Sequence, residues 1–307
     1  MTTRAVPLSK RSSLVLGVAS VAGLMMLVWP LLVRDASGGQ VGPPFVFLAL
    51  VPVVIVVVLA EVTEGGLDPR VLAVLGVLSA VNAVLRGLSP GTAGVELVFF
   101  LLILAGRVFG PGFGFVLGCT SLFASALLTG GVGPWLPYQM LVSAWVGMGA
   151  GLLPRRVTGR AEIAMLAAYG VVAAYAFGLL LNLSSWPFVL GIAVPGHTGL
   201  AFVPGDPLSE NLHRFLIYTL ITSTGSFDTG RAITNAVAIV VLGPAVLTTL
   251  RRAARRVVVT GTVEKALPGT PDASSVGGSD VPHDEHRKEA TMSTPTPGLR
   301  NEAGSQI

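Results

Sequence analysis

Residues 45–60 read FVFLALVPVVIVVVLA, an apolar run in which no charged residue occurs and polar and apolar positions do not alternate. A segment inside a lipid bilayer must satisfy its own backbone hydrogen bonds, so it forms a helix or joins a closed β-barrel. Barrel strands alternate lipid-facing and lumen-facing residues, and this run does not. The stretch therefore predicts a membrane-embedded α-helix and excludes a transmembrane barrel.

The whole chain has the composition of a membrane protein. Of its 307 residues, 52% are hydrophobic and only 12% are charged, and the mean hydropathy is +0.74. In a typical soluble domain about a quarter of the residues are charged. The apolar residues fall in blocks about as long as a helix that crosses a roughly 30 Å hydrocarbon layer. We therefore expect an all-α, polytopic membrane bundle without a second soluble domain.

Eight of these blocks are candidate transmembrane helices. A further apolar segment, 211–224, is short for a span and carries His213 and Arg214 near its start, so we expect it to lie on the outer face or to re-enter the membrane. If it crossed the membrane, the count would be nine. The eight candidates are residues 13–33, 44–60, 71–85, 93–109, 113–129, 135–153, 161–183 and 227–250.

The distribution of Lys and Arg predicts the orientation of these helices. Cytoplasmic loops are enriched in Lys and Arg, and most of the basic residues fall on the cytoplasmic side if the N-terminus lies inside. We therefore expect a multi-pass protein of the plasma membrane with both termini in the cytoplasm. The net charge is +4 and the pI is near 9.6, which could suggest a nucleic-acid partner. The basic residues instead lie beside apolar segments and act as topology signals, so no nucleic-acid partner is expected.

Polar residues inside the predicted spans are the first candidates for a functional site, because they are costly to place in lipid. Their positions near the predicted outer helix ends suggest one outward-facing pocket. Asp228, Arg231 and Asn235 share one helical face, where the first two can pair with each other and with a ligand. Simple hydration at the membrane interface is the alternative, above all for Glu96 and Asn182. The candidates are Asn82, Glu96, Gln139, Asn182, Asp228, Arg231 and Asn235.

The stretch GGVGPWLPYQM at residues 130–140 is the most unusual in the chain, and it falls on a predicted outer turn. Its Gly and Pro residues favour an irregular backbone. Trp135 and Tyr138 either belong to an interfacial aromatic belt or stack on a ligand ring while Gln139 hydrogen-bonds to the edge of that ring. Trp186 could close the same pocket from another helix.

Rows of small residues predict close contacts between helices. Gly110, Gly114 and Gly118 form one row, and Gly147 and Gly151 form another. Helices that carry such rows can bring their backbones close together. We interpret both rows as packing surfaces.

Motifs that would indicate catalysis or cofactor binding do not occur. Cys119 is the only cysteine, which excludes an intrachain disulfide and a cysteine-based metal cluster. The sequence contains no P-loop lysine, no HExxH and no GxSxG. We therefore expect no enzymatic activity, no catalytic residue, no metal site and no cofactor.

Much of the chain resembles a known family, the substrate-binding S components of energy-coupling factor (ECF) vitamin importers. The resemblance rests on GRVFG at 106–110, GPW at 133–135, YQM at 138–140 and the glycines at 147, 149 and 151. The later residues FD at 227–228, RAI at 231–233 and Asn235 resemble the start of the family's final helix. Arg231 stands where that family commonly has His, which puts its ligand role in question.

The resemblance implies an organisation for the chain. Residues 71–256 would form a six-helix substrate-binding core, 13–70 two additional N-terminal helices, 1–12 a cytoplasmic N-terminus and 257–307 a disordered cytoplasmic tail. Family members present small residues on the first core helix to a T component. Gly76, Ala80 and Ala83 have suitable spacing for that contact, and ordinary packing within the chain is the alternative.

The implied function is capture of a vitamin or related small molecule at the outer face, together with a T component and two cytoplasmic ATPases. The alternative is a self-sufficient secondary transporter or channel. Such a protein would couple to an ion gradient through buried ionisable residues near the midplane, and these are scarce here. Aromatic and amide groups suit any flat heterocycle, so cobalamin-like, pterin-like and thiazole-like substrates all stay open.

Overall fold

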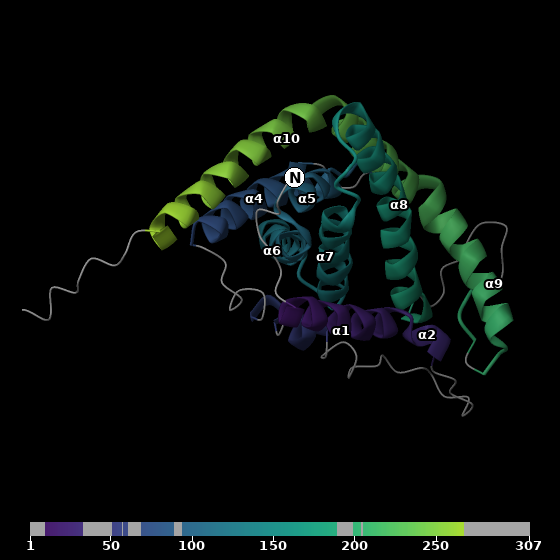
Figure 1. Cartoon of the computed structure of the whole chain (residues 1–307). Coiled ribbons are helices and arrows are strands. Elements are labelled where there is room, and N and C mark those ends of the chain that lie inside the picture. Colours follow the sequence, from purple (N-terminus) through teal and green to yellow (C-terminus); the bar gives the residue numbers. More distant parts are fainter. Residues whose placement is uncertain are drawn as a thin grey trace, which may run out of the picture. The chain divides into compact units, whose positions relative to one another are not determined.

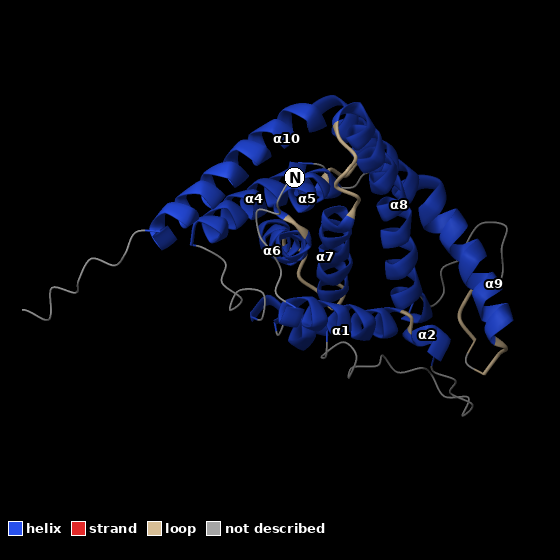
Figure 2. Ribbon diagram, in the orientation of Figure 1, coloured by secondary structure: helices blue, strands red, loops and turns tan. Residues whose placement is uncertain are grey.

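The fold is described from a computed structural model, which covers residues 10–32, 51–56, 58–60, 69–88, 94–188, 199–203 and 205–266. Within these ranges every regular element is helical and no strand occurs (Figure 2). The expectation of an all-α membrane protein is therefore confirmed. Parts of the first two predicted spans and most of the predicted tail lie outside the described residues.

The described elements follow one another along the chain in a fixed order, and Figure 1 labels the α-helices among them. They are α1 (Lys10–Leu27), α2 (Trp29–Leu32), α4 (Pro69–Leu88), α5 (Val98–Phe109), α6 (Pro111–Thr129), α7 (Leu136–Leu152), α8 (Gly159–Ser185), the 3₁₀ helix η2 (Trp186–Phe188), α9 (Leu208–Thr219), the π-helix η3 (Leu220–Asp228) and α10 (Thr229–Ala266).

Helix length and hydropathy do not confirm the predicted count of eight spans. Shorter apolar helices occur at Val51–Ala60 and Val98–Phe109, and α7 has 17 residues. A fully spanning helix needs about 20 residues. Within the described residues, five helical stretches are long and apolar enough to cross a membrane: Lys10–Leu27, Pro69–Leu88, Pro111–Thr129, Gly159–Phe188 and Leu208–Arg256.

The last helical stretch differs from the sequence-based prediction. The segment 211–224 was expected to be separate from a final span at 227–250, but α9, η3 and α10 form one continuous helical run. The predicted break is instead a local change to π-helical hydrogen bonding at Leu220–Asp228. The run also continues to Ala266, so the helix extends into the segment predicted to be a disordered tail.

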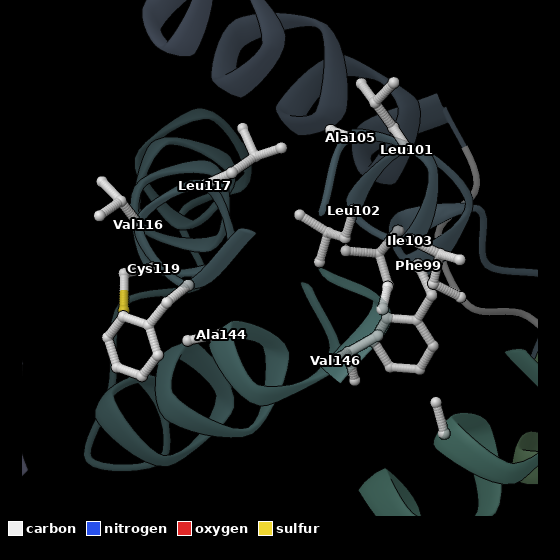
Figure 3. Close-up of a cluster of buried hydrophobic side chains, with 14 of the residues drawn as sticks. Phe99, Leu101, Leu102, Ile103, Ala105, Val116, Leu117, Cys119, Ala144 and Val146 are labelled. Atoms are coloured by element: carbon white, nitrogen blue, oxygen red, sulfur yellow. The ribbon is translucent and has the colours of Figure 1, made fainter. Parts of the chain in front are cut away.

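Helix α5 lies at the centre of the bundle. Every residue of α5 except Val108 is buried, and apart from Arg107 in its last turn its sequence is apolar on all sides. A helix of this kind is enclosed by other helices. It contacts α4, α6, α7 and α8, and Figure 3 shows Leu102 and Ile103 of α5 in the same apolar cluster as Ala144 and Val146 of α7. Helix α5 is thus a protein-enclosed element of the membrane bundle.

Glycines allow α5, α6 and α7 to pack with their backbones in contact. A Cβ atom added to Gly114 of α6 would meet the carbonyl oxygen of Gly147 of α7, and one added to Gly106 of α5 would meet the same oxygen. A Cβ at Gly118 would lie 2.5 Å from the backbone of Ala144. The interpretation of the glycine rows as packing surfaces is confirmed.

The N-terminal helices attach to the bundle through α7 and α8. The indole of Trp145 in α7 donates to Ser20 Oγ of α1 across 3.1 Å. The indole of Trp29 in α2 donates to the carbonyl of Ser184 in α8 across 3.2 Å. These two bonds, each donated by a tryptophan indole, link α1 to α7 and α2 to α8.

Candidate functional site

A network of four charged side chains lies where α4 ends, α5 begins and α10 begins, a region we call the Glu96 end. Arg231 Nε donates to Glu96 Oε2 across 2.7 Å, and Arg231 Nη1 donates to Asp228 Oδ1 across 3.1 Å. Arg86 Nε reaches the other carboxylate oxygen of Glu96 at 3.5 Å. The side chain of Asp228 is 2% exposed and that of Arg86 is 22% exposed, so the network runs from the interior towards the surface.

The segment that carries Glu96 is fastened to η3 and α10. Asn235 Nδ2 donates to the backbone oxygen of Glu96 across 2.7 Å and to that of Arg231 across 2.8 Å. Gly94 has a φ of +78°, and a Cβ at this position would meet the backbone carbonyl of Phe227. Only glycine fits both the dihedral angle and the close approach. The chain before α5 is therefore held against the residues that precede Arg231.

The π-helical turn and a glycine of α8 position the carboxylate of Asp228. Asp228 Oδ2 accepts a hydrogen bond from Ser223 Oγ across 2.9 Å, within η3. On the other side, a Cβ at Gly178 would overlap the Asp228 carboxylate. The absence of a side chain at Gly178 thus provides the space for Asp228. At nine residues, η3 is longer than the single-turn π-bulges that are frequent at functional sites.

Two aromatic rings enclose the guanidinium of Arg231. Its central carbon lies 4.9 Å from the ring centroid of Phe177 in α8 and 5.8 Å from that of Phe99 in α5. The two rings contact each other edge to face at 4.9 Å. A guanidinium over an aromatic face is attracted by the ring quadrupole. Arg231 is therefore held by two carboxylates and two rings at once.

Uncharged polar groups surround Arg86. Its Nη1 donates to Ser125 Oγ at 3.1 Å and its Nη2 to Gln139 Oε1 at 3.3 Å. One turn earlier on α4, Asn82 Nδ2 donates to Ser121 Oγ at 3.0 Å. The Oδ1 atoms of Asn82 and Asn235 are buried and have no hydrogen-bond partner among the described residues. Buried acceptors without a partner are costly, so both amides have capacity to bind a ligand.

The arrangement combines the groups that hold a small polar molecule. Charges of both signs, amide groups and aromatic faces converge on one buried location, and such convergence is typical of small-molecule sites. Among the described residues no group of three His, Cys, Asp or Glu side chains could hold a metal ion. The contacts within the site are hydrogen bonds, ion pairs and cation–aromatic contacts.

The structure brings together many, but not all, of the residues predicted for this site. Glu96, Gln139, Asp228, Arg231 and Asn235 belong to one connected network, and Asn82 lies one helical turn away on α4. Among the described residues, no side-chain hydrogen bond or ion pair joins the remaining predicted residues to it, namely Trp135, Tyr138, Asn182 and Trp186; Trp135 is linked only through its backbone carbonyl, which accepts from Gln139 N–H at 3.1 Å.

Trp186 lies in a different environment from the charged network. Its side chain is 1% exposed, its indole donates to the carbonyl of Leu200 across 2.9 Å, and its ring contacts Phe202 and Phe215. Trp135 is instead 55% exposed at the start of α7. The two predicted tryptophans thus occupy separate locations. Trp186 lies within a hydrophobic cluster and Trp135 lies on the surface.

Sequence reasoning missed several members of the network. Arg86 was not among the candidates, because it follows the predicted span 71–85, although it lies four positions after Asn82 and so on the same helical face. Phe99, Phe177 and Gly178 gave no signal, because apolar residues and glycines are common in every predicted span. Their role depends on which faces of α5 and α8 turn towards Arg231.

The residues predicted to contact a T component differ in exposure. Gly76 and Ala80 are exposed on α4, and a Cβ at Gly76 would meet no atom within 4 Å. Ala83 is fully buried. Of these three residues, Gly76 and Ala80 are on the surface of α4 in this conformation, and Ala83 is not.

A second charged cluster lies at the opposite ends of the same helices. Arg107 Nε donates to Glu162 Oε1 across 2.7 Å, and Arg251 Nη2 also donates to Glu162 across 2.7 Å. Arg107 additionally donates to the carbonyls of Leu153 and Val157 at 3.0 and 2.9 Å. The cluster joins α5, α8, α10 and the connection between α7 and α8, and sequence reasoning did not identify it.

Comparison with known protein families decides what this helical bundle is. The sequence model described as "ECF transporter, substrate-specific component" matches residues 70–262. The chain belongs to this family. Both charged clusters and every predicted site residue lie within the matched range. No curated protein and no solved structure matches the chain.

Membership in this family establishes the general role of the protein. The substrate-specific component, or S component, is the membrane subunit of an ECF transporter that binds the transported molecule, and it is not an enzyme. A multi-pass membrane location follows from the family and from the apolar helices. In this S component the charged network at the Glu96 end is the strongest candidate for the site of that binding.

Proposed function

We propose that this S component captures a vitamin or related small molecule at the outer face of the plasma membrane, through the network at the Glu96 end. The observation that carries the proposal is the convergence of Glu96 and Asp228 on Arg231, whose guanidinium lies against the rings of Phe99 and Phe177. The arginine distribution supports an outward position for the Glu96 end. The opposite end of the bundle, which contains Arg251, carries the larger number of basic residues, and such residues are enriched on the cytoplasmic side. Both termini would then be cytoplasmic.

The proposed binding residues fall into two groups. Glu96, Gln139, Asp228, Arg231 and Asn235 would contact the ligand directly, because they already share one hydrogen-bonded network. The second group would contribute when the ligand is bound or when the outer ends of the helices rearrange around it, and it comprises Asn82, Trp135, Tyr138, Asn182 and Trp186.

Transport would require further subunits. In this proposal a T component and two cytoplasmic ATPases supply the energy, and the S component topples in the membrane to release its ligand. Gly76 and Ala80 on the exposed face of α4 support a close contact with a T component, since small residues let helices approach each other. Ala83 would contribute only after α4 moves.

Copurification and uptake test the proposal together. The full chain is purified from its membrane, and mass spectrometry identifies any small molecule released on denaturation. Uptake of that molecule by cells is then measured with and without the T component and ATPases. We expect a bound molecule, and uptake that depends on the ATPases. A purified chain that releases no small molecule, or uptake of the released molecule that persists without the ATPases, would contradict the proposal; the second outcome would favour a secondary transporter.

A further inference from the structure

We propose that the molecule bound by this S component carries an anionic group, a carboxylate or a phosphate, and that Arg86 binds this group. The inference rests on the proposed function and specifies its substrate class. It follows from how the two carboxylates of the network, Glu96 and Asp228, pair with its two arginines, Arg231 and Arg86. Both carboxylates pair closely with Arg231, and Arg86 has only a long contact with Glu96.

Both carboxylates of the network bind Arg231 more closely than Arg86. Glu96 and Asp228 lie 2.7 and 3.1 Å from Arg231, whereas Glu96 lies 3.5 Å from Arg86. Charge-assisted hydrogen bonds between nitrogen and a carboxylate oxygen are usually about 2.7–2.9 Å long. Arg231 is thus neutralised within the protein, and Arg86 is only weakly so.

The edge of Arg86 that suits a carboxylate is poorly used. Nε and Nη2 form the side of the guanidinium that binds both oxygens of a carboxylate in parallel. In this structure Nε reaches Glu96 at 3.5 Å and Nη2 reaches the neutral amide of Gln139 at 3.3 Å. Both bonds are long. A ligand carboxylate or phosphate would replace them with two short charge-assisted bonds.

Arg86 is also the most exposed of the four charged side chains in the network. Its side chain is 22% exposed, compared with 13% for Glu96 and Arg231 and 2% for Asp228. An anion arriving from solvent therefore meets Arg86 without disturbing the contacts of Arg231. Asn82, one turn deeper on α4, presents its unpartnered Oδ1 to hydrogen-bond donors on the rest of the ligand.

A cationic substrate fits these observations less well. It would need the carboxylates of Glu96 and Asp228, and both are occupied by Arg231. Binding would require Arg231 to leave the rings of Phe99 and Phe177 as well. The geometry favours addition of an anion at Arg86 over expulsion of Arg231, and the experiment separates the two cases.

Three aromatic probes of similar size and different charge provide the test: benzoate, neutral benzamide and cationic benzamidinium. The purified full chain is placed in lipid nanodiscs, and its thermal unfolding is followed as each probe is titrated. We expect benzoate to stabilise the wild-type protein and the other two to have no effect. Arg86→Gln should weaken the apparent affinity for benzoate by roughly tenfold or more, as expected for loss of a charge-assisted pair.

Two further variants keep the test decisive if Arg86→Gln does not fold. Glu96→Gln removes the negative charge beside Arg86, so it should strengthen benzoate binding, whereas it would weaken binding of a cation. Arg214→Gln is the matched control, because Arg214 pairs with Asp206 at 2.7 Å outside the network, and it should leave benzoate binding unchanged.

Three outcomes would each overturn the inference. They are stabilisation of the wild-type protein by benzamidinium alone, unchanged benzoate binding in Arg86→Gln, and weaker benzoate binding in Glu96→Gln. These outcomes leave the proposed function intact if the copurified molecule is neutral or cationic and its uptake needs the ATPases. A purified chain that releases no small molecule, or uptake of the copurified molecule that persists without the ATPases, would instead overturn the proposed function itself.

Discussion

Arg107 Nε of α5 donates to Glu162 Oε1 of α8 across 2.7 Å, and the two side chains are only 5% and 3% exposed. Arg251 of α10 approaches both oxygens of the same carboxylate at 2.7 Å. A single carboxylate thus joins three helices at the end of the bundle opposite Glu96. Glu162 lies at the other end of the helices from the proposed binding network. Mutations there can therefore change the stability of the bundle without touching the residues of the network.

Replacement of Glu162 by Gln should destabilise the protein without changing its ligand contacts. The substitution leaves Arg107 buried without a charged partner, and breaking a buried pair costs about 3–5 kcal/mol. Thermal unfolding in detergent measures the effect. The matched control is Glu210→Gln, because Glu210 is 59% exposed and lies 3.5 Å from Arg214, and exposed pairs contribute about 1 kcal/mol or less. Equal melting temperatures for both variants would contradict this prediction.

Gly114→Leu should disrupt the contact between α6 and α7. Its new side chain would collide with the backbone carbonyl of Gly147, which cannot move without shifting a helix. We expect a loss of about 3 kcal/mol or more, measured by thermal unfolding. Gly17→Leu serves as the control, since a Cβ at Gly17 meets no atom within 4 Å. A stable Gly114→Leu variant would show that the two backbones are further apart.

Gly178→Ala should weaken ligand binding through Asp228. The added methyl group overlaps the Asp228 carboxylate, which must move away and lose its 3.1 Å bond to Arg231. We expect roughly tenfold weaker binding of the copurified molecule, equivalent to about 1.4 kcal/mol, measured by isothermal titration. In the control Gly170→Ala, the new methyl group meets only the side-chain ends of Ile239 and Ile103, at 3.2 and 3.3 Å. Similar affinities for both variants would exclude a role for Asp228.

Gly76→Leu combined with Ala80→Leu should abolish uptake and leave ligand binding intact. Both residues are exposed on α4, so bulky side chains there would fit within the monomer but would keep a partner helix at a distance. Copurification of the T component with the variant measures the association directly. The variant Gly17→Leu, on the exposed side of α1, should retain both uptake and association. Wild-type uptake in the double variant would place the partner surface elsewhere.

Several features of this protein could be predicted from its sequence because they depend on one segment at a time. Apolar blocks predict helices, since a backbone in lipid must satisfy its own hydrogen bonds. The i, i+3 and i+7 spacing of Asp228, Arg231 and Asn235 places them on one face, and the structure shows Asp228 bonded to Arg231. The glycine rows around Gly114 and Gly147 similarly predicted close packing.

Relations between segments needed the tertiary structure. The rotation of α5 about its axis decides that Phe99 contacts Arg231, and the uninterrupted apolar run from Val98 to Ala105 has no periodicity from which that rotation could be read. The pairing of Arg86 with Glu96, and of Arg107 with Glu162, likewise depends on which helix ends meet. Hydropathy and motifs are local properties, so the residues alone predicted a helical membrane bundle and its family, although not the number of its spans. Which charges share a site depends on how the helices are rotated and placed against one another, so this pairing became known from the tertiary structure.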